Sequence, residues 1–349
     1  MKKPFCCALL PIVLSLGLLS CGGATTSGTG GGGGTGGGGT GGGGTGGGGG
    51  GTGGSELGQQ IPCNSPAGTV CYSLVVNSVT RTYALHLPSN FQKNTSALVI
   101  VLHGTSGTGL TVEGLTGFST LADQTGFAVA YPDGLVNPNS GETDWAYFSN
   151  DFADDVGFIR QLISAVQTSV VSDPKQVFIA GFSAGGFMSH RLGVQASDLV
   201  AAIGVVEGAV ASNGRPPTVP TALGPVSVLI LHGDQDQTVH YCGSQSDASQ
   251  EETFNYWAGS SANSCSTFDT QSALCDSQGD ISPLSEKDAT SCTGNAEVKF
   301  YKLIGGTHTW STSAMNVPSQ TPYNPDFDST TGITTTTIVW NFFAAHHKP

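Results

Sequence analysis

The stretch KQVFIAGFSAGGFMSHRL at residues 175–192 decides the fold of this chain. A short apolar run at 175–180 suits a buried strand, and the residues after 185 contain no helix breaker. Between them stands G-x-S-x-G, which predicts a tight turn that presents the Ser183 hydroxyl as a nucleophile. The flanking glycines leave room for the strand and helix to approach each other. Taken alone the motif is weak, because a glycine-rich turn with an inert serine has the same pattern.

Apolar runs and helical patterns alternate on both sides of this stretch. Continuous apolar strands that are interleaved with helices predict an α/β fold with a mostly parallel, doubly wound sheet. Such sheets carry their chemistry at the carboxyl ends of the strands. The expected strands are 72–77, 81–88, 97–102, 127–131, 175–180, 199–206, 226–231 and 297–304, and the expected helices are 118–125, 154–171, 186–192 and 334–346.

A serine nucleophile needs an imidazole base, and that base needs a carboxylate to orient it. His308 lies in a glycine-containing loop directly after the last strand, and we predict that it is the base. Among the other histidines, one is on the nucleophile helix, one is at a strand end, one is in a loop and two close the last helix: His190, His232, His240, His346 and His347.

Two aspartates follow the strand at 226–231, as the expected order Ser, Asp, His requires. Asp236 is the predicted orienting carboxylate, and Asp234 is the alternative. Both could instead cap the loop, or their D-x-D spacing could bind a cation. The predicted oxyanion donors are the backbone amides of Ala184 and Thr105, the latter in a glycine-rich loop that could also be merely flexible.

An ordered set of motifs resembles the polyhydroxybutyrate depolymerase-like esterases, which include secreted feruloyl and acetyl-xylan esterases and esterase lipoproteins. The resemblance implies a single catalytic domain of the α/β-hydrolase fold, with Ser183, Asp236 and His308 as its triad. The reaction it implies needs no metal or organic cofactor. The motifs are HG at 103–104, YPDG at 131–134, DDVGFI at 154–159, GFSAGG at 181–186, HGDQD at 232–236 and GTHTW at 306–310.

Three departures from the family pattern concern the rim of the acyl site. His240 precedes Tyr241, Ser311 follows Trp310, and the segment 242–292 is longer than expected. They leave the acyl group open among feruloyl, acetyl and hydroxyalkanoate. An aromatic substrate rim is expected from Trp145, Tyr147, Tyr241 and Trp310, although these could be ordinary core or surface aromatics. A non-catalytic polysaccharide-binding protein and a peptidase on the same fold are the alternative functions.

The N-terminal region has the layout of an export signal. A basic start and an apolar run end in LLSC at residues 18–21, which resembles the lipobox of bacterial lipoproteins. We therefore expect a signal peptide at 1–20, a lipidated Cys21 and a Gly/Thr-rich tether over 21–54. The esterase domain is expected at 55–349. A plain signal peptide with an incidental cysteine is the alternative.

Charge and cysteine content narrow the class further. The formal net charge of −13 disfavours nucleic acid or an anionic membrane surface as the main partner, so the expected partners are an ester substrate and a membrane reached only through the lipid anchor. Six cysteines follow the leader, an even number that favours disulfides in an exported chain. The local pair Cys63–Cys71 is predicted; Cys242, Cys265, Cys275 and Cys292 are left without an assigned pairing.

Overall fold

The computed structural model describes residues 56–148, 152–211, 224–259, 262–268, 273–275, 279, 281–284, 286–311 and 334–349. The predicted signal peptide, Cys21 and the Gly/Thr-rich tether lie outside the described residues. Within the described ranges, no helix is both long enough and apolar enough to cross a bilayer.

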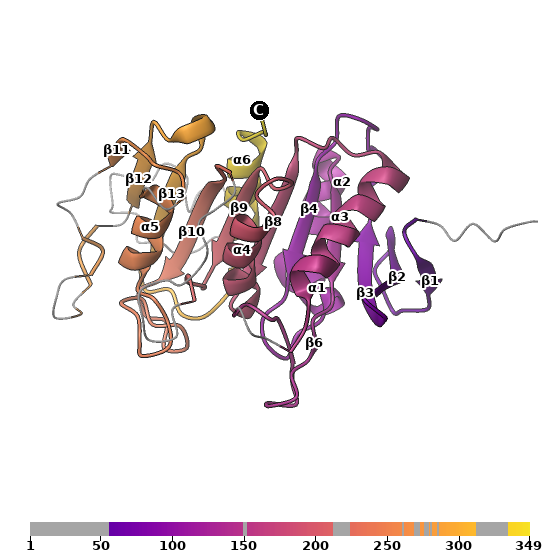
Figure 1. Ribbon diagram of the computed structural model, residues 1–349, viewed down its shortest axis with the longest axis horizontal. Coiled ribbons are helices and arrows are strands. Elements are labelled where there is room, and N and C mark those ends of the chain that lie inside the picture. Colours follow the sequence, from indigo (N-terminus) through magenta and orange to yellow (C-terminus); the bar gives the residue numbers. More distant parts are fainter. Residues whose placement is uncertain are drawn as a thin grey trace, which may run out of the picture. The chain divides into compact units, whose positions relative to one another are not determined.

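An eleven-stranded sheet forms the centre of the described residues (Figure 1). A separate hairpin pairs β6 (Leu135–Val136) with β7 (Thr143–Asp144). In spatial order the strands of the main sheet are β1 (Gln59–Ile61), β2 (Thr69–Val76), β3 (Val79–His86), β5 (Ala128–Pro132), β4 (Leu98–Leu102), β8 (Val177–Phe182), β9 (Ala202–Val206), β10 (Ser227–Gly233), β13 (Val298–Leu303), β12 (Glu286–Thr290) and β11 (Thr267–Phe268).

The central strands from β5 to β13 run parallel, whereas both edges of the sheet are antiparallel. The difference follows from burial. Strands β4, β5 and β9 are buried along their whole length, as a parallel sheet covered on both faces requires. Strands β2 and β12 alternate between buried and more exposed positions, which is the pattern of an edge with one wet face. The predicted parallel sheet is therefore confirmed for its centre.

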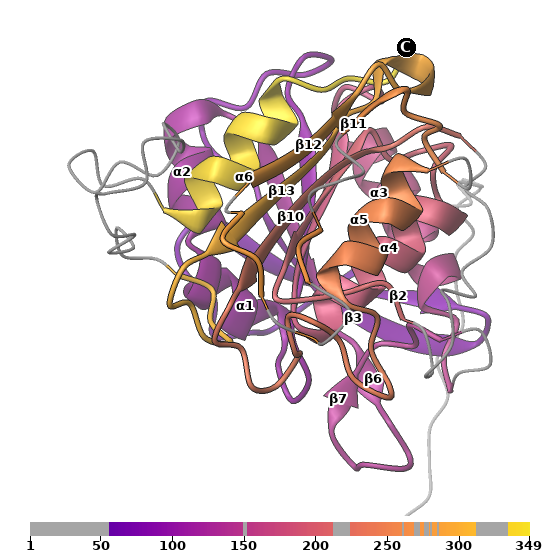
Figure 2. The same ribbon diagram turned by 90° about the vertical axis from the view of Figure 1, so that its left-hand side faces the viewer.

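Helices cover the two faces of the sheet, as Figure 2 shows. On one face lie α3 (Asp155–Val170), α4 (Ala184–Gln195) and α5 (Gln250–Ala258), which bury Phe158, Met188 and Phe254. On the other lie α1 (Gly109–Thr116), α2 (Phe118–Thr125) and α6 (Thr335–Ala344). The two layers hold the central strands rigidly, so the loops at their carboxyl ends start from fixed positions.

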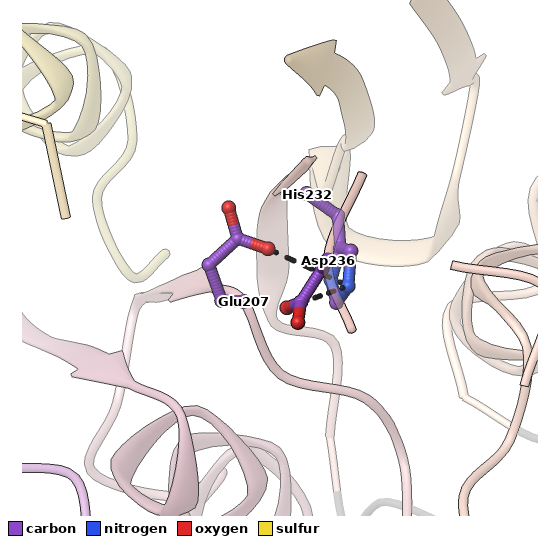
Figure 3. A group of neighbouring side chains, drawn as sticks. All are labelled: Glu207, His232 and Asp236. Carbon is purple, nitrogen blue, oxygen red and sulfur yellow. Dashed lines mark ion pairs between the residues drawn. The ribbon is translucent and has the colours of Figure 1, made fainter. Parts of the chain in front are cut away.

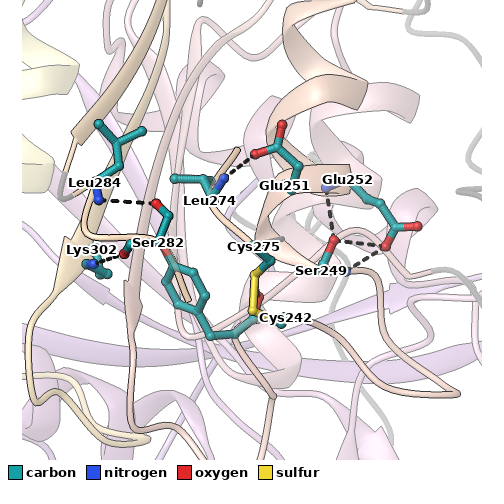
Figure 4. Close-up of a disulfide and its surroundings, with 10 residues drawn as sticks. Cys242, Ser249, Glu251, Glu252, Leu274, Cys275, Ser282, Leu284 and Lys302 are labelled. Atoms are coloured by element: carbon teal, nitrogen blue, oxygen red, sulfur yellow. Dashed lines mark hydrogen bonds between the residues drawn. A yellow bond between two sulfur atoms is a disulfide. The ribbon is translucent and has the colours of Figure 1, made fainter. Parts of the chain in front are cut away.

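Three disulfides occur among the described cysteines: Cys63–Cys71, Cys242–Cys275 and Cys265–Cys292. The first is the predicted local pair. The other two cross-link the long segment after Asp236, and they interleave along the chain. Figure 4 shows Cys242–Cys275 beside the start of α5, where the Glu251 carboxylate accepts a hydrogen bond of 2.7 Å from the Leu274 amide. The two disulfides thus cross-link the segment 242–292 internally, and α5 is one of its elements.

Candidate active site

Ser183 sits on a strained turn between β8 and α4. Its φ of 55° and ψ of −121° are unusual for a residue with a side chain. The two glycines of the motif are required by contact: a Cβ on Gly181 would lie 2.0 Å from the Gly185 carbonyl oxygen, and one on Gly185 would lie 2.3 Å from that of Leu102. The predicted G-x-S-x-G elbow is therefore formed, with each glycine at a point of close backbone approach.

Three side chains from separate strand ends meet in series. The Ser183 Oγ is 2.9 Å from His308 Nε2, and His308 Nδ1 is 2.7 Å from Asp236 Oδ2. An ionised carboxylate only accepts hydrogen bonds, so Nδ1 carries the ring proton toward Asp236. In the neutral ring, Nε2 is then left to accept the serine proton. The geometry is that of a hydroxyl, a base and an orienting acid.

Asp236 is held in place by its own loop. Its Oδ1 accepts hydrogen bonds from the amides of Thr238 at 2.7 Å and Val239 at 3.0 Å. Burial acts to raise the pKa of Asp236, but the hydrogen bonds from His308 and from these amides outweigh it and lower the pKa to about 2. The carboxylate is consequently ionised whenever His308 is neutral.

The alternative aspartate, Asp234, has a different place. Its Oδ1 accepts a 2.7 Å hydrogen bond from the amide of Gly305, and the Gln235 amide donates to the carbonyl of Gly306 at 2.9 Å. A Cβ on Gly233 would lie only 2.3 Å from that same carbonyl oxygen. Asp234 thus fastens the histidine loop to the aspartate loop, while Asp236 contacts the ring.

The predicted oxyanion loop lies against the nucleophile. A Cβ built on Gly104 would be 3.2 Å from the Cβ of Ser183. Among the described residues, nothing accepts a hydrogen bond from the Thr105 amide. Ala184 is the first residue of α4, so its amide has no carbonyl one turn earlier to bond. The two predicted oxyanion amides are therefore without a hydrogen-bond acceptor among the described residues.

His103 supports this loop from below. Its Nδ1 donates to the Gly104 carbonyl at 2.7 Å, and its Nε2 accepts from the Gly134 amide at 2.9 Å. Burial lowers the pKa of His103, which fits a neutral ring with one donor and one acceptor. The ring therefore joins the HG and YPDG motifs, a link that their separation in the sequence does not reveal.

The expected aromatic rim is wrong for three of its four members. Trp145, Tyr241 and Trp310 are only 1%, 2% and 3% exposed. Trp145 donates its indole N–H to the His103 carbonyl at 2.8 Å, and Trp310 donates to Thr336 Oγ1 at 2.9 Å, so both are structural supports. Tyr241 packs edge-on against His232 and Phe300. Tyr147 alone is partly exposed, and its ring packs 5.2 Å from that of Phe187.

The remaining histidines do not approach Ser183 in this way. His190 and His232 are buried, and burial lowers their pKa to about 3 and about 4. His190 Nδ1 accepts from the Trp257 indole at 2.9 Å. His346 pairs with Glu297 at 3.2 Å. These three rings are therefore engaged elsewhere in the fold.

Sequence reasoning missed one acid at this end of the sheet. Glu207 directly follows β9, the strand between the serine strand and the aspartate strand, and its side chain is fully buried. The sequence does contain a signal for it, a charged residue at the carboxyl end of an apolar strand. The same kind of position led to the prediction of Ser183, Asp236 and His308.

A sheet covered by helices on both faces, with Ser183, His308 and Asp236 in contact at its carboxyl edge, defines an α/β-hydrolase fold. A solved thermostable esterase has the same fold, with a TM-score of 0.50 and 14% identity, over 80% of this chain and 64% of that one. Residues 81–217 match the family described as Esterase PHB depolymerase. The match contains Ser183 and Thr105, whereas Asp236 and His308 lie beyond it.

Two curated relatives align with about half of this chain. NocK of Nocardia uniformis subsp. tsuyamanensis, provisionally named an esterase, is 32% identical over 172 residues, 49% of each chain. Feruloyl esterase B of Piromyces equi is 30% identical over 180 residues, 49% of this chain and 32% of that protein. The chain thus spans half or less of these relatives' length.

Proposed function

We propose that this protein is a serine carboxylic-ester hydrolase that acts through Ser183, His308 and Asp236. The observation that carries the proposal is the unbroken series of contacts, 2.9 Å from serine to histidine and 2.7 Å from histidine to aspartate. It is supported by the strained φ of Ser183 and by the family match, which is an esterase family.

The reaction follows from the donors and acceptors at the site. Ser183 Oγ attacks the ester carbonyl carbon as its proton passes to His308 Nε2, and the amides of Thr105 and Ala184 hold the oxyanion. The C–O bond to the alcohol then breaks, and the leaving oxygen takes the proton from His308. Water attacks the acyl-enzyme with His308 as base, which releases the acid and returns the proton to Ser183.

The proposal is tested with p-nitrophenyl acetate. Wild-type protein should release p-nitrophenol, and Ser183→Ala should lower kcat by about 10⁴–10⁶. Ser172→Ala, which removes a buried hydroxyl after α3, is the matched control and should keep full turnover. A wild-type protein without activity on any ester, but with retained binding to polysaccharide, would favour a binding module. Turnover of peptides without turnover of esters would favour a peptidase.

We propose that the natural substrates are esters of plant polysaccharide or polyhydroxyalkanoate. The support is the family description and a relative named feruloyl esterase. A panel of feruloyl, acetyl and 3-hydroxybutyryl esters compared by kcat/KM separates these acyl groups. Uniform low rates across the panel would contradict all three.

We also propose export and lipid anchoring through Cys21, followed by the tether at 21–54 and the esterase domain at 55–349. The support is the LLSC sequence at 18–21 and the solvated composition that follows. A single acyl chain binds a membrane weakly, whereas several chains on one residue anchor it stably. Cys21→Ser should move the protein from the membrane fraction to the soluble fraction. An unchanged distribution would contradict the anchor.

A further inference from the structure

Glu207 lies close to Asp236 and His232. It is 0% exposed and directly follows β9, and its φ of 51° is positive, as is that of Ser183. Its amide donates to the Leu231 carbonyl at 3.0 Å, which fixes the backbone. Figure 3 shows its carboxyl group pointing toward His232 and Asp236.

The three side chains form the kind of group that can hold a metal ion, since one ligand atom of each lies within 4.8 Å of the others. Their atoms are already in use, however. His232 Nε2 carries a proton that it donates to the Val239 carbonyl at 2.8 Å, so it has no lone pair for a metal. Asp236 Oδ2 is bonded to His308, and both Glu207 oxygens accept from the Gly233 amide at 3.1 and 3.0 Å.

The charges point to a proton in this group. Besides Asp236, the titratable groups that face Glu207 are His232, which is buried and neutral, and His308 beyond Asp236. Burial first, and then the adjacent Asp236, raise the pKa of Glu207 well above its usual range against the opposing effect of the Gly233 amide. Carboxyl oxygens of Glu207 and Asp236 lie within 4.8 Å of each other in a buried site, where one proton between the two groups avoids a pair of like charges, and Asp236 is the stronger acid.

We propose that Glu207 is a neutral carboxylic acid that donates its O–H to Asp236, so that the pair presents one negative charge to His308. Glu207 is then a positioning residue: it completes the hydrogen bonds that fix Asp236 without adding charge. A second negative charge would favour the protonated imidazole and keep His308 out of its base form to higher pH. The inference rests on the proposed function, because only there does Asp236 orient a base.

Two variants separate charge from shape. Glu207→Gln keeps a neutral side chain that can donate to Asp236, and Glu207→Ala removes it. With p-nitrophenyl acetate, Gln should keep kcat within about threefold, and the midpoint of the acidic limb of the pH–rate profile should move by less than about 0.3 unit. Ala should lower kcat about tenfold or more with little change in KM. Glu113→Gln, a buried glutamate that accepts from Thr69 and Ser119, is the control and should behave as wild type.

If the midpoint of the acidic limb of the pH–rate profile were lower by about one pH unit in Glu207→Gln than in wild type, the substitution would have removed a charge. That result would overturn the proposal. A second readout needs no ester turnover. Infrared difference spectra at about pH 7 should show a protonated carboxyl band in wild type that is absent in Glu207→Gln and present in Glu113→Gln. Absence of that band from wild type overturns the inference whether or not the protein is an esterase. So does a divalent metal that copurifies with wild type and is lost from Glu207→Gln.

Discussion

The described part of the chain contains two series of hydroxyl, imidazole and carboxylate. In one, Ser183 meets His308 at 2.9 Å and His308 meets Asp236 at 2.7 Å. In the other, Thr69 Oγ1 meets His86 Nδ1 at 3.0 Å, and His86 Nε2 meets Asp123 at 3.0 Å. By residue types and distances alone, the two are hard to tell apart.

Their surroundings differ. Thr69 lies within strand β2, and its single hydroxyl proton points to a second acid, Glu113 Oε1, at 2.6 Å. That proton is not available to the ring. Among the described residues, the Ser183 hydroxyl bonds only His308, and the loop that starts at Gly104 lies against Ser183. The comparison teaches that a triad needs an uncommitted hydroxyl proton and oxyanion donors, in addition to three residue types in line.

The largest contrast is expected from the two imidazoles. His308→Ala removes the base and should lower kcat for p-nitrophenyl acetate by about 10⁵–10⁶, as removal of such a residue does in other serine hydrolases. His86→Ala removes a buried ring from the other series and should reduce stability while leaving kcat of the folded protein within about twofold. Steady-state kinetics and thermal unfolding check both. Comparable kcat losses for the two variants would erase the distinction.

A smaller contrast is expected from the carboxylates. Asp236→Asn keeps the shape but favours the wrong tautomer of His308, and should lower kcat by about 10⁴. Asp123 is exposed and lies outside the site, so Asp123→Asn should leave kcat unchanged. Rates measured across a pH series on the two purified variants test this. Full activity of Asp236→Asn would remove Asp236 from the mechanism.

The next largest effect is expected from the loop that contains Thr105, which only the Ser183 series has beside it. Thr105→Pro deletes one backbone N–H and should lower kcat by about 10²–10³. Thr105→Ala keeps the amide and loses only the side chain, whose hydroxyl is a distant 3.4 Å from Asp144, so it should be near wild type. A thermal unfolding measurement on Thr105→Pro shows whether the variant is folded, so that a loss of kcat is not mistaken for a folding defect. Equal losses in both variants would assign the effect to the side chain instead.

Much of the site followed from the sequence because its residues stand at the ends of apolar strands. Ser183, Asp236 and His308 each follow such a run, and parallel strands bring their carboxyl ends together. The same rule applies to Glu207, but a triad has three members, so the motif gives no role to a fourth side chain. The aromatic rim failed because an aromatic residue near a motif can support it from within, as Trp145 does beneath His103.

The disulfides mark where sequence reasoning ends. Cys63 and Cys71 are eight residues apart across a turn, so their pairing is local. The other pairs are separated by 33 and 27 residues and interleave. Their pairing depends on how α5 and the edge strands pack, and spacing carries no information about that.

The smallest expected effect concerns stability, and it compares the two acids that flank the series. Glu113 accepts from the Thr69 hydroxyl, whereas we propose that Glu207 donates to Asp236. A glutamate whose pKa is raised in the folded state binds more protons there, so its contribution to stability is full below about pH 4.3 and falls as the pH rises. Glutamine does not titrate, so Glu207→Gln does not lose stability in this way. The unfolding free energy of Glu207→Gln minus that of wild type, measured in urea, should therefore increase with pH above about pH 4.3. The increase should be up to about 1.4 kcal/mol per pH unit and should stop at the folded-state pKa of Glu207. A difference that stays flat with pH would mean that Glu207 ionises as it does in water, and that Asp236 is not held by a neutral acid.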